Sequence, residues 1–183
     1  MRVVGGLLKG RRLASLKGAP IRPTSDKVRE AIFNILPREF PFKKVLDLFA
    51  GTGAMGIEAL SRGAGSVTFV DADAGSCAVI RKNLEACGVK EGARVLRGDA
   101  SRELNALSRW GEGFDLIFVD PPYNTALFEE SLKEIGRLGL LGAEGTLVAE
   151  TSKRAPLKAE VPGLELFDER RYGDTIVYFL KRR

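Results

Sequence analysis

Val45-Leu-Asp-Leu-Phe-Ala-Gly-Thr-Gly-Ala-Met-Gly56 is an apolar run that turns into a glycine-rich loop and then into an apparent helix. Residues 45–49 are mostly apolar, as expected for a parallel strand that is buried on both faces. Asp47 is the one charge in this strand, and a carboxylate at such a place suggests a function. The chain downstream is typical of further βα units added to this first one.

The glycines of this stretch fit the pattern G-x-G-x-x-G, with Gly51, Gly53 and Gly56 at the three positions. Asp71 follows 20 positions after Gly51, at the end of the next apolar run. Such glycines allow a tight turn, let a ligand lie against bare backbone and let the following helix pack closely. An acid at the tip of the second strand can bind ribose hydroxyls, so the pattern predicts a ligand that contains adenosine.

Two ligands fit this pattern, and a glycine-rich turn that binds nothing is the structural alternative. An adenine dinucleotide needs its pyrophosphate at the helix N-terminus. S-adenosylmethionine has no phosphate and brings an ammonium and a sulfonium instead. Asp47 lies just before the turn and suits a cationic ligand better than a pyrophosphate.

The composition is that of a soluble globular protein. The 183 residues are 44% hydrophobic and 29% charged, which is enough chain to bury about 70% of its unfolded surface. No apolar run approaches the roughly 18 residues of a membrane span, and the first residues lack a signal-peptide core. We therefore expect a cytoplasmic protein without membrane contact, and separately we expect a monomer. We expect a single domain over residues 1–183, with a basic arm and helix in 1–36 and the core in 43–183.

Cysteine and histidine usage narrows the chemistry. Cys77 and Cys87 lie ten positions apart around one apparent helix, so no disulfide is expected between them. The chain has no histidine, which removes the commonest metal ligand and the usual general base near neutral pH. We expect no metal site.

Charge is concentrated at the start of the chain. The net charge is +5 and the sequence pI is about 9.4, which favours a polyanionic partner. No acidic residue precedes Asp26. The candidate nucleic-acid contacts are Arg2, Lys9, Arg11, Arg12 and Arg22, with Lys17 between them and Lys181 to Arg183 as a second basic cluster. The alternative is a merely solvated arm.

Residues 2–17 predict a short β-hairpin or an arm over the main domain, because glycine pairs alternate there with apolar and basic positions. A helix follows, with Thr24 or Ser25 as N-cap, Asp26 near the positive end of its dipole, and Pro37 as its stop. Its apolar face is formed by Val28, Ile32, Ile35 and Leu36, while Arg29, Glu30 and Asn34 are expected on other faces as solvated or structural groups.

The rest of the chain alternates strands and helices. Strands are predicted at 66–70, 94–96, 114–119 and 145–150, helices at 54–62, 76–86, 101–109 and 127–138, and a final hairpin at 164–171 and 175–181. This order predicts an α/β fold with a mixed sheet and one antiparallel edge strand. Asp99 and Ala100 follow the third strand, where Asp99 could accept a hydrogen bond from a ligand amine or cap the next helix.

The strand at 114–119 runs directly into Asp120-Pro121-Pro122-Tyr123. Paired prolines fix φ and remove donors, so a rigid strand-to-helix turn is one interpretation. The other is chemical. The Asp120 carboxylate and the Pro121 carbonyl can accept the N–H hydrogens of an exocyclic amine, which favours a pyramidal nitrogen with its lone pair directed at an electrophile. Tyr123 offers a ring on which a base can stack.

These motifs resemble a known family. Residues 120–123 resemble the (D/N/S)-P-P-(Y/F) motif of S-adenosylmethionine-dependent amino-methyltransferases, and residues 47–53 resemble their cofactor loop. More narrowly, the chain resembles the bacterial 16S ribosomal RNA guanine-N2 methyltransferases of the RsmD type. The segments that carry this narrower resemblance are Arg22 to Asn34, Gly5 to Leu13, Glu58 to Ala64 and Tyr172 to Thr175.

The resemblance implies a class I methyltransferase fold, a Rossmann-like three-layer sandwich whose seven-stranded sheet has an antiparallel last strand. It implies S-adenosylmethionine as cofactor and one guanine N2 of 16S rRNA, free or in an assembled or assembling small ribosomal subunit, as target. It places the methionine end of the cofactor at Asp47, Gly51 and Gly53, the ribose at Asp71 and the adenine at Asp99, with Phe49, Ala72 and Ala100 bordering it and Thr24 closing over it.

The mechanism that we predict is direct in-line transfer to a flipped-out guanine N2, without a covalent intermediate or a metal. Three alternatives remain. A DNA adenine or cytosine methyltransferase would use the same chemistry. A nicotinamide-dependent oxidoreductase would leave residues 120–123 unexplained. A silent RNA-binding module is disfavoured by the presence of Asp47, Asp71 and Asp120.

Overall fold

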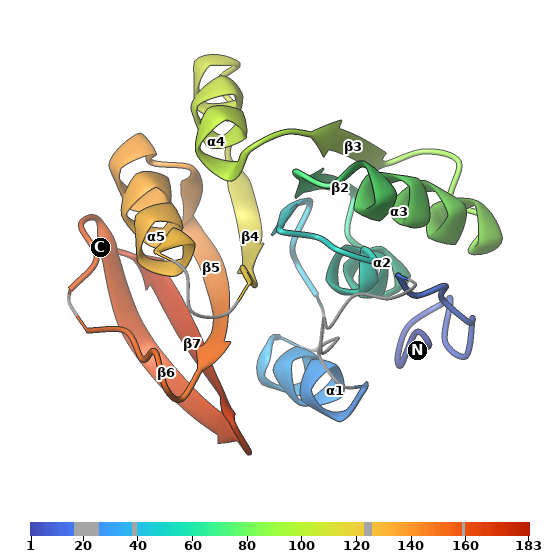
Figure 1. Cartoon of the computed structure of the whole chain (residues 1–183), viewed down its shortest axis with the longest axis horizontal. Helices are drawn as coiled ribbons and strands as arrows, with labels where there is room; N and C mark the ends of the chain where they lie inside the picture. The colour runs from blue at the N-terminus through green and yellow to red at the C-terminus, as the bar shows by residue number, and fades with distance from the viewer. Residues whose placement is uncertain (17–25, 38–39, 123–125, 159) are drawn as a thin grey trace.

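The computed structural model describes residues 1–16, 26–37, 40–122, 126–158 and 160–183. Helices cover both faces of a central sheet (Figure 1). The strands are β1 (Lys44–Leu48), β2 (Ser66–Asp71), β3 (Ala93–Arg97), β4 (Phe114–Val119), β5 (Leu141–Ser152), β6 (Leu164–Tyr172) and β7 (Thr175–Arg182). The helices are α1 (Asp26–Ile35), α2 (Ala54–Ser61), α3 (Ala74–Ala86), α4 (Ala100–Arg109) and α5 (Leu127–Leu138).

The seven strands lie in the order β3-β2-β1-β4-β5-β7-β6. The first five strands are parallel, and β7 runs antiparallel to both of its neighbours. The last strand is therefore antiparallel, as predicted, but it is not an edge strand, because β6 lies outside it. Most residues of β7 are buried and most of β6 are exposed, so the more apolar strand of the hairpin takes the inner position.

The sheet separates two hydrophobic cores. Helices α1, α2 and α3 and residues of the N-terminal arm contribute to one core, and α4 and α5 contribute to the other. Side chains along β7 point alternately to the two faces of the sheet and so contribute to both cores. Val177 and Phe179 belong to the first core, whereas Ile176 and Tyr178 belong to the second. The fold is the three-layer α/β sandwich that the sequence predicted.

Several predicted boundaries differ from the structure, most of them by one or two residues. Strand β1 ends at Leu48, so Phe49 lies in the following turn, with φ of 62°. Strand β5 begins at Leu141, four residues early, because a register irregularity lets it pair with Phe114 before the regular ladder at Thr146. Of the two predictions for residues 2–17, a hairpin or an arm over the main domain, the described residues 2–16 form the arm, with a single antiparallel bridge between residues 2 and 12.

The two cysteines, Cys77 and Cys87, are free and buried, as expected. Within the described ranges, no helix has both the length and the apolar character that crossing a membrane requires.

Close packing of α2 on β2 depends on Gly56. A Cβ added at Gly56 would lie 2.3 Å from a ring carbon of Phe69 and 2.8 Å from a methyl carbon of Val67. Real Cβ atoms do not approach other atoms so closely, and both neighbours are core residues with no room to move. Any side chain at position 56 therefore pushes the helix away from the sheet.

We predict that Gly56→Ala lowers the free energy of unfolding by about 2 kcal/mol, as overpacking in cores does. Chemical denaturation measures this. Gly113→Ala is the matched control, because an added Cβ there meets no atom within 4 Å. Equal stability of the two variants would contradict the packing argument.

Candidate functional site

The site is formed where β1, β2 and β4 end. Leu48 is the last residue of β1 that pairs with β2 and β4, so the next residue on each strand, Phe49, Asp71 and Asp120, lies at about the same level. With strands about 4.8 Å apart, Asp71 and Asp120 are roughly 10 Å apart on either side of the glycine turn. The strand order reverses between β1 and β4, and open α/β sheets bind ligands at this switch point.

The turn after β1 has a left-handed backbone at three of its residues. Phe49, Gly51 and Gly53 have φ values of 62°, 56° and 76°. A Cβ added at Gly51 would meet only the Phe49 carbonyl, 4.0 Å away, whereas one at Gly53 would lie 3.2 Å from Ile80. Gly51 therefore leaves an open backbone face against which a ligand can lie, while Gly53 and Gly56 serve the packing of α2.

Asp47 is almost completely buried, with 3% of its surface exposed. Its Oδ2 accepts a hydrogen bond from the Gly56 N–H at 2.8 Å, in the first turn of α2. Burial raises the pKa of Asp47 to about 7, with the Gly56 N–H opposing the shift and the charge of Asp71 adding to it. The reason for a charge in this strand is thus partly structural, because the carboxylate binds an unpaired donor at the helix N-terminus.

The position of Asp47 bears on the choice of ligand. A dinucleotide would bring its pyrophosphate to the N-terminus of α2, where a buried carboxylate already occupies one N–H group. Two anions in this poorly solvated place repel each other, whereas a cationic ligand would be attracted. The geometry favours S-adenosylmethionine over a dinucleotide.

Asp71 joins the loops of two strands. Its Oδ2 accepts a hydrogen bond from the Gly51 N–H at 2.7 Å, and its Oδ1 accepts one from the Asp73 N–H at 2.8 Å. A carboxylate oxygen can accept more than one hydrogen bond, so ribose hydroxyls can still bind. Asp71 thereby orients the turn and remains available to a ligand. Ala72, beside it, is exposed.

Asp99 is the N-cap of α4. Its Oδ1 accepts hydrogen bonds from the Ser101 and Arg102 N–H groups at 3.0 and 3.3 Å, and Ala100 is buried in the first turn. The structural interpretation of Asp99 is therefore confirmed, and it does not exclude contact with a ligand. In the described part of the chain, no three His, Cys, Asp or Glu side chains are close enough to hold a metal ion.

The Asp120-Pro121-Pro122 segment follows β4 directly. Asp120 is half-buried, Pro121 is buried and Pro122 is exposed. Among the candidate residues, Tyr123, Thr24 and Arg22 lie outside the described residues, as do Lys17 of the basic arm and the alternative N-cap Ser25.

The N-terminal arm, residues 1–16, lies beside the glycine turn. The Asn83 side-chain amide donates to the Thr52 carbonyl at 2.9 Å and to the Ala14 carbonyl at 3.1 Å. The Thr52 hydroxyl lies 3.9 Å from the Met1 sulfur. One end of the arm therefore lies next to the candidate cofactor loop, and the other end is linked to the loop through Asn83.

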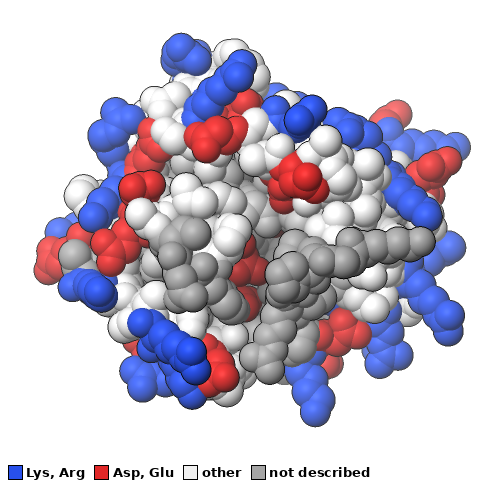
Figure 2. Space-filling model, in the orientation of Figure 1, with Lys and Arg blue, Asp and Glu red and all other residues white. Residues whose placement is uncertain are grey.

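The candidate nucleic-acid contacts of the arm are exposed, namely Arg2, Lys9, Arg11 and Arg12. Arg2 lies 3.8 Å from Asp26, and no ion pair among the described ranges includes the other three. Figure 2 shows acidic atoms in the hollow at the centre of the face in view, and lysines and arginines interspersed with acidic side chains around its rim. Acidic atoms at the centre suit a cationic ligand there.

Asn83 and Glu58 had no role predicted from the sequence. Arg29 was predicted to be either a solvated or a structural group. All three are buried, whereas Glu30 and Asn34 are exposed. Helical spacing could have predicted that two of these residues are buried. Asn83 lies three positions after Ile80, and Arg29 lies three positions before Ile32, so each shares a helix face with a buried residue.

The fold and the site together define a class I, S-adenosylmethionine-dependent methyltransferase. Residues 1–181 match the model of the family described as Conserved hypothetical protein 95, and the chain belongs to this family.

Similar proteins agree with this family. YlbH of Bacillus subtilis, named as a candidate rRNA methyltransferase, is 40% identical over 183 residues and is covered completely, as is this chain. Ribosomal RNA small subunit methyltransferase D of Escherichia coli K12 is 34% identical. The alignment covers all of this chain and 90% of that protein. The structure of YhhF, a candidate methyltransferase from Escherichia coli, superposes with a TM-score of 0.84 at 33% identity, covering 100% of this chain and 97% of that one. The RsmD-type resemblance is confirmed.

The raised pKa of Asp47 predicts a pH dependence of stability. In the unfolded chain this carboxyl has an ordinary pKa near 3.9, so between about pH 4 and 7 the folded state binds more protons. The free energy of unfolding therefore falls as pH rises across this window, at most by about 1.4 kcal/mol per pH unit from this group. We predict that Asp47→Asn flattens the fall, as measured by urea unfolding at several pH values.

The control for this prediction is Glu144→Gln, because Glu144 is exposed on β5 and belongs to none of the ion pairs among the described residues. That variant should keep the wild-type dependence on pH. Parallel curves for wild type and Asp47→Asn would show that the Asp47 carboxyl titrates normally.

Proposed function

We propose that this protein transfers the methyl group of S-adenosylmethionine to the exocyclic N2 of one specific guanine in 16S rRNA of the small ribosomal subunit. The observation that carries the proposal is the alignment of Asp71, the open glycine turn and Asp120 on adjacent strands, with a basic arm fixed beside them. Each component has a partner in the reaction. One copy of the chain contributes all of them, in keeping with a cytoplasmic monomer.

The cofactor, when bound, supplies a sulfonium methyl group as electrophile. Asp47 would attract its ammonium, and the open backbone face of Gly51 would receive its methionine end. Asp71 would bind its ribose hydroxyls, in addition to the backbone groups that this carboxylate already holds. Asp99 would lie towards its adenine, with Phe49, Ala72 and Ala100 as neighbours and Thr24 as the residue proposed to close over it.

The target amine is a poor nucleophile because its lone pair is delocalised into the base. Asp120 and the Pro121 carbonyl accept its two hydrogens, so the lone pair is directed at the methyl group. An ionised carboxylate can accept but not donate, which selects an amine over a carbonyl oxygen. Holding the amine and the methyl group in a fixed relative orientation supplies most of the rate enhancement. The guanine must leave its stack to reach the site. Asp120 can take the proton that the nitrogen then loses.

The first prediction from this mechanism concerns Asp120. We expect Asp120→Ala to lower transfer of labelled methyl at least about a hundredfold, as loss of a preorganised polar group does, while cofactor affinity stays nearly unchanged. Asp120→Asn should retain part of the activity, since an amide oxygen still accepts. Labelled S-adenosylmethionine, unmodified small-subunit RNA or subunits, and nucleoside analysis measure transfer, and calorimetry measures cofactor binding.

The control is Glu160→Ala, because Glu160 is exposed and its ion pair within the described residues is with Arg183 at the end of the chain. Label in N2-methylguanosine from RNA, and none in duplex DNA, is the expected result. Label in DNA adenine or cytosine would retain the mechanism and replace the substrate. Equal loss of transfer and cofactor affinity in Asp120→Ala would assign Asp120 to cofactor binding or to folding.

The basic arm generates a second prediction. Replacing Arg11 and Arg12 by Ala should weaken RNA binding and reduce the magnitude of the slope of log affinity against log salt by about 1.4, because each lost phosphate contact removes about 0.7. Filter binding over a range of salt concentrations measures this. Arg170 and Arg171 on β6 pair with Asp168 and Glu169, so their double Ala variant is the control. An unchanged slope in the arm variant would make the arm a scaffold.

A further inference from the structure

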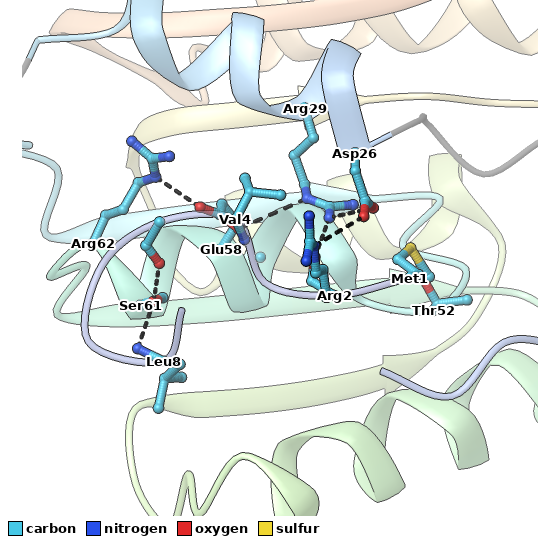
Figure 3. Close-up of polar contacts among 12 residues, drawn as sticks. Met1, Arg2, Val4, Leu8, Asp26, Arg29, Thr52, Glu58, Ser61 and Arg62 are labelled. Atoms are coloured by element: carbon cyan, nitrogen blue, oxygen red, sulfur yellow. Dashed lines mark hydrogen bonds and ion pairs between the residues drawn. The ribbon is translucent and has the colours of Figure 1, made fainter. Parts of the chain in front are cut away.

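A buried charged cluster lies beneath the N-terminal arm. Glu58 of α2 and Arg29 of α1 have fully buried side chains, and the Arg29 Nε lies 3.7 Å from Glu58 Oε2. The second Glu58 oxygen lies 2.8 Å from the Nε of Arg62. Arg29 also pairs with Asp26 at 2.9 Å. Figure 3 shows these side chains converging from two helices under the arm.

The cluster binds the backbone of the arm. Glu58 Oε2 accepts a hydrogen bond from the Val4 N–H at 2.8 Å, and Arg29 donates one to the Arg2 carbonyl (Figure 3). Val3, between these two residues, is 1% exposed and lies in the core. The segment that carries Arg2 therefore has one fixed path across α1 and α2.

Ser61, the last residue of α2, holds the turn of the arm. Its hydroxyl accepts from the Leu8 N–H at 2.9 Å and donates to the Gly5 carbonyl, and its own carbonyl accepts from the Leu7 N–H at 2.7 Å. Gly6 has φ of +71°, and a Cβ added there would lie 1.9 Å from the Ser61 carbonyl oxygen. The turn that precedes Lys9, Arg11 and Arg12 is therefore clamped to the helix.

Burying charged side chains costs free energy, and the arm already has apolar side chains that attach it to the core. Taking ions out of water costs free energy that their mutual attraction only partly offsets. Among the described residues, Arg29 Nε and Nη1 have no hydrogen-bond partner. Val3 and Leu13 would hold the arm to the core without Glu58. Apolar contacts do not select individual backbone groups, whereas the charged cluster binds particular backbone N–H and carbonyl groups. The cluster therefore holds the arm in a single position.

We propose that Glu58, Arg29 and Ser61 are positioning residues for RNA docking. They hold the arm in one conformation, so its cations are in place before the RNA arrives and binding does not have to order the arm. The RNA then meets a rigid surface that continues from the arm to the glycine turn through Asn83 and Thr52. This inference rests on the proposed function, because it requires RNA to be the partner.

The test uses Ser61→Ala, which frees the turn without leaving a buried charge unpaired. We expect a five- to tenfold rise in KM for the RNA, about the effect of losing a hydrogen-bonded anchor, with kcat and cofactor affinity unchanged. Hydrogen exchange should show faster exchange of the Val4 and Leu7 amides. Neither amide bonds to the Ser61 hydroxyl, so both report movement of the whole arm. Gly6→Ala, which pushes the turn off the helix, should raise KM at least as much.

The control is Ser131→Ala, which removes a buried serine from α5 on the opposite face of the sheet. A double-mutant cycle adds a readout that a general loss of stability would not give. In the background that lacks Arg11 and Arg12, Ser61→Ala should have a smaller effect on RNA affinity, because fewer cations remain to be positioned. Additive effects would overturn the inference.

Other outcomes separate this inference from the proposed function. If the wild-type protein binds 16S rRNA but transfers no methyl, the proposed function fails and the arm is judged from RNA dissociation constants alone. If the amides exchange faster in Ser61→Ala while RNA affinity stays at the wild-type value, the position of the arm does not matter and the inference fails. Wild-type protein without affinity for RNA would overturn both.

Discussion

The structure depends on how closely helix α2 approaches strands β1 and β2. Gly53 and Gly56 have no side chain to hold the helix away, and Asp47 reaches from β1 to the Gly56 N–H. The same approach brings the turn after β1 under Asp71, which binds the Gly51 N–H. It also brings Glu58 and Ser61 under the arm. The cofactor loop and the docking arm are thus attached to opposite ends of one short helix.

The carboxylates of the site have structural tasks as well as the chemical tasks that we propose for them. Asp71 and Asp99 bind backbone N–H groups of loops or helix termini, and Asp47 caps α2. Loops at the ends of strands have unpaired donors, and acceptors that bind them make the loops rigid. A ligand then meets groups that are already oriented, so its binding includes only a small entropic cost for ordering them.

Much of this could be predicted from the sequence. The βα order, the glycine turn and the carboxylates at the ends of strands are local patterns, and each was placed correctly to within a few residues. The inner position of β7 was not predicted, because it depends on a comparison of burial between the two strands of one hairpin. Arg29 was not assigned to the core for a related reason. A lone cation beside Ile32 looks solvated until Glu58, Asp26 and the Arg2 carbonyl are brought to it by other parts of the chain.

The pairing of β1 with β4 brings together residues about 70 positions apart in the sequence. Closing so long a loop has a larger entropic cost than forming any of the neighbouring βα pairs, and contacts of this range are slow to form. The glycine turn lies on one side of that joint and Asp120 on the other. A chain in which only the local βα units have formed would therefore hold the two halves of the site apart. The geometry required for chemistry arises only with the completed sheet.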